Sequence, residues 1–216
     1  MKRIIKIKKM VSKKKEKEIF TKLNSEFKNE TFIDLNIRAI LKKNSISEED
    51  FYYFFPNKTK SLCSFFLIDL QLKLEKKIKN KIKNEKSISK RVNFILFELI
   101  KLLNGNKAVS LFFLNYISRK PIYLKKITIK FSDRVWRLLD DKSVDFNYYT
   151  KRLILSQILI NSILYWRGSN DLNKTQVFIE KQIFLLGKFG YYKSNFKKFI
   201  SKIAPKNFFT KFDFLH

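Results

Sequence analysis

The chain has 216 residues, of which 45% are hydrophobic, and its formal net charge is +28. This length suits one domain, or one domain with small appendages, and is enough to bury a sizeable core. Because the chain has one Cys and one His, the terminal His216, a disulfide framework is excluded, and catalytic triads and His-based metal sites nearly so.

Three interpretations of the positive charge stay open. Clustered cations bind nucleic acid by releasing counterions from phosphates, and they also bind anionic membrane surfaces. The third interpretation is compositional drift, because Lys, Ile, Asn and Phe are all abundant together. Only eight of the 47 basic residues are Arg, which weakens a sequence-specific DNA role.

Scarce breakers (4 Gly and 3 Pro) and long stretches of helix-period apolar residues predict an all-α fold. No apolar run approaches the length of about 18 residues that spans a bilayer. Residues 1–18 are basic but lack the apolar core of a secretory signal. We expect a solvated, partly disordered tail there, with a weak contact to lipid or nucleic acid as the alternative.

The spacing then predicts helices over about residues 16–28 and 32–43, a third helix capped by Ser47, and a fourth from Asn57 or Thr59. The stretch FIDLNIRAILKKNSISEEDFYYFFPNKTKSL resembles the helix-turn-helix domain of TetR-type regulators over roughly residues 19–70. The third helix starts with the acids Glu48, Glu49 and Asp50, which would repel a DNA backbone. We therefore expect a helix-turn-helix kept as a scaffold, with Cys63 as a small core residue.

Residues 71–190 predict a larger helical domain. After a Lys-rich continuation, helices are expected from Ile88 to about 105, within VSLFFLNYISR, and from Pro121 to Leu139. The last of these spaces a set of apolar residues three to four apart: Ile122, Ile127, Ile129, Phe131, Val135 and Leu138. Apolar helices over about 149–166 and 172–189 follow, and they suit either a homodimer interface or core packing.

Residues 191–216 pattern as a Lys- and Phe-rich amphipathic tail, which favours membrane binding over a helix packed back on the bundle. The expected membrane-binding side chains are Lys193, Phe196, Lys197, Lys198, Phe199, Ile200 and Ile203.

One string is more specific than the rest. DKSVDFNYYTKR, from Asp141 to Arg152, contains the pattern DxSxDxNxYTxR, and an apolar helix and the pair Thr175 and Phe178 come after it. This arrangement resembles the lipid-binding accessory proteins of coenzyme Q (ubiquinone) biosynthesis, which have a TetR-like fold. The two resemblances agree and together cover most of residues 19–190.

The resemblance implies a homodimer that is not an enzyme, has no cofactor, and holds an isoprenoid lipid or phospholipid in an apolar pocket. It also implies a peripheral position on the inner membrane, on the cytoplasmic side in bacteria or the matrix side in mitochondria. The partner would be a di-iron hydroxylase acting on a polyprenylated quinone precursor. The implied partner-binding residues are Asp145, Asn147, Tyr148, Tyr149 and Arg152. The alternative function is a TetR-like DNA-binding regulator with a lipid effector.

The residues also make physical sense unaided. Residues 131–150 hold four acids and three bases, a neutral-to-acidic island in a cationic chain that can steer a basic partner. Tyr and Arg are enriched at binding hot spots. A helix N-cap with an internal ion pair between Asp145 and Arg152 is the structural alternative. Mitochondrial relatives tend to have Gly where this chain has Asp140.

Overall fold

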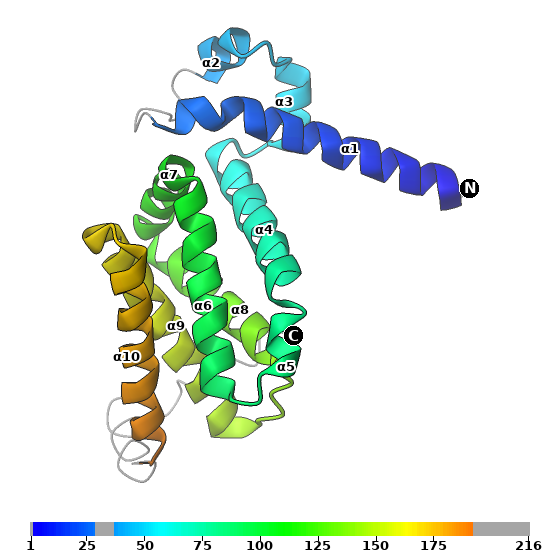
Figure 1. Ribbon diagram of the computed structural model, residues 1–216. Helices are drawn as coiled ribbons and strands as arrows, with labels where there is room; N and C mark the ends of the chain where they lie inside the picture. Colours follow the sequence, from blue (N-terminus) through cyan, green and yellow to red (C-terminus); the bar gives the residue numbers. More distant parts are fainter. Residues whose placement is uncertain (1, 29–36, 192–216) are drawn as a thin grey trace. The chain divides into compact units, whose positions relative to one another are not determined.

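The computed structural model describes the backbone of residues 2–28 and 37–191 and the side chains of residues 12–27, 37–144 and 147–185. Every regular element in these ranges is helical (Figure 1), which confirms the predicted all-α class. The TetR-like arrangement of the helices stays a prediction. Within the described ranges, no helix is long and apolar enough to cross a bilayer.

The chain forms two compact units. Residues 1–81 with 98–127 make the first unit, and residues 82–97 with 128–216 make the second. Two long helices, α6 (Ile88–Gly105) and α8 (Pro121–Leu138), contribute residues to both units. The boundaries of the functional domains expected from the sequence stay predictions.

The first unit begins with α1 (Lys2–Lys22), continued by the short 3-10 helix η1 (Leu23–Lys28). Its start corrects the expectation of a partly disordered basic tail over residues 1–18. Lys is a good helix former, and no Gly or Pro interrupts the chain before Pro56, so nothing local stops the helix.

The predicted helix-turn-helix elements are present as α2 (Ile37–Lys43) and α3 (Glu48–Phe54). Ser45 has a left-handed backbone between them, with φ of 52°. Ser47 stands at the predicted N-cap of α3, but its side chain makes no capping hydrogen bond. α3 ends before Pro56, and α4 (Thr59–Ile78) then begins at one of the two predicted positions.

The core of the first unit is an aromatic cluster on α7 (Lys107–Ser118). The ring of Phe113, which is fully buried, lies 4.9–6.0 Å from those of Phe20, Phe27 and Phe66. Cys63 is buried, as predicted. The abundant Phe of this chain therefore serves, in this unit, to hold α1, η1, α4 and α7 together.

The second unit contains α5 (Lys81–Asn84) from its second residue on, α9 (Asp145–Ser169) and α10 (Leu172–Tyr191), together with parts of α6 and α8. α9 and α10 pack side by side (Figure 1). The turn between them contains Asn170, whose φ of 53° closes α9 in a left-handed conformation. The rings of Tyr165 and Phe178 stack across the pair, 4.2 Å apart.

Only part of the predicted apolar stripe of α8 is buried. Val135 of the stripe is buried together with Thr128 and Ser132, whereas Ile122 is 85% exposed. The Ser132 hydroxyl lies 2.9 Å from that of Ser156 on α9. Small polar side chains let α8 approach α9 closely, because a paired hydroxyl can be buried at little cost.

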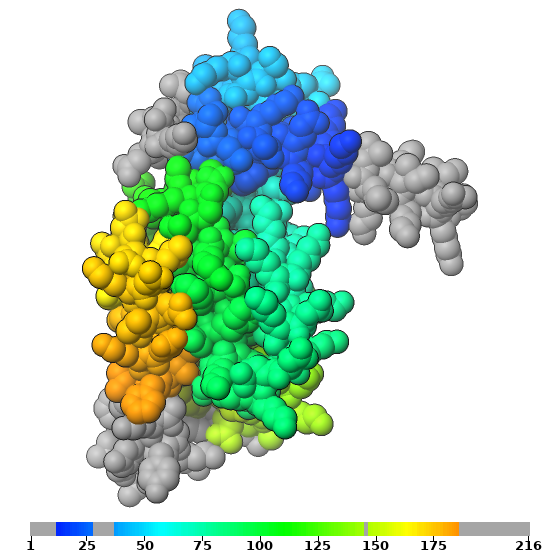
Figure 2. Space-filling model, in the orientation of Figure 1, coloured from blue at the N-terminus to red at the C-terminus, as the bar shows by residue number. Residues whose placement is uncertain are grey.

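Core packing explains part of the apolar character of α9 and α10, and the homodimer interface stays a prediction. α9 buries Leu155, Ile158, Leu159 and Trp166, so it is a core helix. Other apolar side chains of the two helices are 40–62% exposed, namely Leu153, Leu164, Val177, Phe184 and Leu185. Figure 2 shows one side of α10, in yellow and orange, that is not covered in this view.

Candidate functional site

The candidate site is the corner between α8 and α9, where α8 ends in a Schellman motif. The Asp141 N–H donates to the Trp136 carbonyl at 3.0 Å, and the Asp140 N–H donates to the Arg137 carbonyl at 3.1 Å. Asp140 occupies the left-handed position of this motif, with φ of 55°. Glycine suits that backbone best, because it has no Cβ.

The start of α9 differs from the structural alternative in which Asp145 is the N-cap. The N-cap is Val144, which makes no side-chain capping hydrogen bond, and Asp145 is the first helical residue. An acid in the first turn faces the positive end of the helix dipole, so this position also suits an Asp. The side chain of Asp145 lies outside the described residues.

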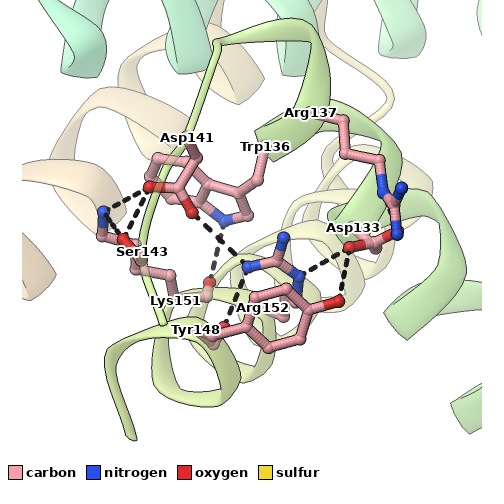
Figure 3. Close-up of polar contacts among 8 residues, drawn as sticks. All are labelled: Asp133, Trp136, Arg137, Asp141, Ser143, Tyr148, Lys151 and Arg152. Carbon is pink, nitrogen blue, oxygen red and sulfur yellow. Dashed lines mark hydrogen bonds and ion pairs between the residues drawn. The ribbon is translucent and has the colours of Figure 1, made fainter. Parts of the chain in front are cut away.

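Arg152 of α9 is the centre of the corner (Figure 3). Its side chain is only 5% exposed and lies between two carboxylates. Nε donates to Asp133 Oδ1 at 2.7 Å, and Nη1 reaches Asp141 Oδ2 at 3.5 Å and the Tyr148 carbonyl at 3.0 Å. The guanidinium thus ties the end of α8, the turn and the first turns of α9 together.

A second cation, Lys151, completes the inner side of the turn. Its Nζ donates to Asp141 Oδ1 at 2.6 Å and to Ser143 Oγ at 2.5 Å. The same Nζ lies 5.1 Å from the centre of the Trp136 ring, and the Trp136 Nε1–H donates to the Lys151 carbonyl at 3.1 Å. Trp136 therefore contacts both the charge and the backbone of one residue.

The Asp133 carboxylate accepts hydrogen bonds from three side chains on the outer side of the corner. Besides Arg152, the Tyr148 hydroxyl donates to it at 3.0 Å and Arg137 Nε donates at 2.7 Å. The face of the Tyr148 ring covers the Arg152 guanidinium, whose carbon lies 3.3 Å from the ring centre. This cation–π contact and the hydroxyl together fix the position of Tyr148.

The carboxylates titrate abnormally because of these contacts. Burial raises the pKa of Asp133, but hydrogen bonds from Arg152, Arg137 and Tyr148 outweigh it and lower the pKa overall. Burial likewise raises the pKa of Asp141, but hydrogen bonds from Lys151 and Ser143 outweigh this effect and lower the pKa overall. Both groups are therefore held ionised at neutral pH.

The structure separates the predicted partner-binding residues into two kinds. Asn147 is exposed, and Tyr148 and Tyr149 are half-buried with their rings edge-to-face at 5.1 Å. Arg152 is buried inside the ion pairs, so it supports the corner and offers little surface to a partner. The predicted membrane-binding residues, 193–203, lie outside the described residues.

Sequence reasoning missed Asp133, Trp136 and Lys151 as members of this network. The available signal was weak: the i,i+4 spacing of Asp133 and Arg137, and the excess of acids in residues 131–150. Within the part of the chain with described side chains, no group of His, Cys, Asp and Glu could hold a metal ion.

The corner pairs its charges inside and has polar and aromatic side chains outside. Residues 124–190 match the family model described as COQ9. The matched region holds most of α8, all of α9 and nearly all of α10, and it contains the whole ion-pair network. The match confirms the resemblance seen in the sequence: COQ9 is an accessory family that takes part in coenzyme Q biosynthesis. Searches of curated proteins and of solved structures gave no significant match.

The ion pairs predict a loss of stability in acid. A lowered carboxylate pKa stabilises the fold fully above about pH 4, the pKa of an unfolded Asp, and this contribution is lost as the pH falls further. Asp141→Asn should lower the free energy of unfolding by about 2–3 kcal/mol at pH 7 and flatten its decline below about pH 4. Urea unfolding from neutral to acid pH measures both effects.

The matched control is Asp140→Asn, which removes one charge from the adjacent exposed residue. It should keep the decline in stability that the unsubstituted protein shows below about pH 4, with only a small gain at neutral pH from the loss of an anion at the negative end of the α8 dipole. Equal profiles for the two variants would contradict the role given to Asp141.

The left-handed backbone at Asp140 predicts a stabilising substitution. Asp140→Gly should raise the free energy of unfolding by about 1 kcal/mol, because Gly adopts this backbone without a Cβ clash. It also removes an anion from the negative end of the α8 dipole. Asp140→Ala removes the same charge but keeps the clash, so it should gain less. The urea midpoints of the two variants measure this difference. Equal gains in stability for Gly and Ala would refute the backbone argument.

Proposed function

We propose that this chain is a non-enzymatic lipid-binding accessory protein of ubiquinone biosynthesis. It binds isoprenoid quinone precursors at the membrane and presents them to a di-iron hydroxylase. The observation that carries the proposal is the braced α8–α9 corner, because its entire network falls inside the residues that match COQ9.

The hydroxylase contact is assigned to the outer edge of this corner. Asn147 and Tyr149 lie on the first turns of α9, and Tyr148 is fixed by Asp133 and Arg152. Aromatic side chains held in one position lose little conformational entropy on binding, which favours affinity. The buried ion pairs thus supply a preformed surface.

The exposed apolar side chains of α9 and α10 support the lipid and dimer parts of the proposal. Leu164 is 60% exposed and Phe184 is 62% exposed. Apolar side chains gathered on one pair of helices need cover from a second copy or a lipid tail. The assembly we propose is a homodimer with an acyl or prenyl tail beside these helices.

Regulation of transcription has less support. α3 begins with Glu48, Glu49 and Asp50, and the first two are exposed. Asp50 pairs with Lys15 at 2.7 Å, and Glu48 lies 3.6 Å from Arg38. These exposed pairs neutralise cations that a phosphate backbone would need, so the arrangement disfavours DNA binding.

The partner surface is tested by pull-down of the hydroxylase. The double substitution Asn147→Ala and Tyr149→Ala should weaken the complex by about thirtyfold, the loss of roughly 2 kcal/mol typical of a hot spot. Gln157→Ala, at an exposed position two turns further along α9, is the control and should bind normally. Arg152→Ala is unsuitable because it leaves two carboxylates without their buried cation. Normal binding by the double variant, with an unchanged melting temperature, would refute the surface.

Lipid binding is tested by native mass spectrometry of protein purified from membranes. We expect a bound prenyl lipid, because the apolar helices can hold such a tail without any catalytic group. The Asn147→Ala and Tyr149→Ala protein should retain the lipid, which separates lipid binding from hydroxylase binding. A protein that is consistently empty would refute the lipid part alone.

A further inference from the structure

The corner between α7 and α8 exposes an aliphatic side chain that the predicted pattern placed on the apolar stripe. Ile122, in the first turn of α8, is 85% exposed. At about 100° per residue, it lies roughly a third of a turn away from the buried Thr128 and Val135. α8 therefore cannot bury Ile122 against the same neighbours.

Cations surround this side chain in the sequence. Arg119, Lys120, Lys125 and Lys126 are all exposed, and together with Pro121 and Ile122 they form what we name the basic tip. The chain has no acidic residue between Glu98 and Asp133. All charged side chains of residues 99–132 are therefore basic, a segment much longer than the basic tip itself.

The basic tip is held in place by defined contacts of the first unit. Lys120 Nζ donates to the Tyr116 hydroxyl at 2.7 Å and lies 4.0 Å from the centre of its ring. The Leu124 N–H donates to the Lys120 carbonyl at 2.9 Å. The Tyr123 hydroxyl interacts with the side chains of Cys63 and Ser64 on α4. Ile122 is thus presented outward by a fixed backbone.

We propose that the basic tip is a membrane-contact site, in which Ile122 enters the acyl boundary of an anionic bilayer and the four cations contact lipid phosphates. An apolar side chain flanked by Lys and Arg is the arrangement that interfacial binding requires, because each part meets its own layer of the lipid. Nucleic acid phosphates would bind the cations, but a nucleic acid backbone provides no apolar layer in which an exposed Ile side chain could be buried. The site is separate from the predicted tail at residues 193–203, and its failure would leave the proposed function intact.

The test places an environment-sensitive nitrobenzoxadiazole probe at position 122 of the full chain, as Ile122→Cys. The native Cys63 does not compete for the label, since it is buried and burial raises the pKa of its thiol to about 12. Vesicles of phosphatidylglycerol and phosphatidylcholine should shift the probe emission to the blue and increase its intensity. Vesicles of phosphatidylcholine alone should have much less effect.

The matched control is the same probe at Ile68→Cys, a 58% exposed aliphatic position on α4 of the same unit. It should stay in water. Ile122→Ser should reduce partition into anionic vesicles by about tenfold, as expected for one inserted aliphatic side chain, and Ile68→Ser should not. Lys125→Glu with Lys126→Glu should reduce partition more than Lys76→Glu with Lys79→Glu, which changes the net charge equally.

Two results would overturn the site. One is an unchanged probe at position 122 in the presence of anionic vesicles, or equal responses at positions 122 and 68. The other is a probe at position 122 that responds to duplex nucleic acid and not to vesicles, which would assign the basic tip to that polymer.

Discussion

The α8–α9 corner depends on one buried cation, the guanidinium of Arg152, held between the carboxylates of Asp133 and Asp141. Removing a charge from water is costly, and the cost is offset only where geometry and hydrogen bonds are good. Here Nε, Nη1, a backbone carbonyl and the Tyr148 ring all take part. These contacts join α8 to the first turns of α9, so they position the outer residues of the corner.

These ion pairs leave fewer free acids in the neutral-to-acidic island of residues 131–150 than the sequence count indicates. Two of its four acids, Asp133 and Asp141, accept hydrogen bonds from cations of the corner itself. The surface left for a partner is therefore less acidic than the sequence count suggests, and it consists mainly of polar and aromatic side chains. Recognition by shape and by hot-spot contacts follows more directly than recognition by charge.

α8 thus begins and ends with different chemistry. Its first turn belongs to the basic tip, with Ile122 exposed beside exposed Lys and Arg side chains. Near its end, Asp133 and Arg137 of α8 and Asp141 of the turn pair their charges with one another or with Lys151 and Arg152 (Figure 3). These are the two surfaces that we propose for a lipid layer and for a protein partner, respectively.

The sequence by itself determined the all-α class, the ends of most helices and the string from Asp141 to Arg152 that led to the family. These features depend on local signals, such as the Pro121 that opens α8 and the turn at Asn170. The tertiary structure decided the partners of Arg152, which lie 19 and 11 residues away, and the burial of Ser132 in place of Ile122. Periodicity tells which residues share a helix face, but only the approach of a second helix decides which face is covered and which charges meet.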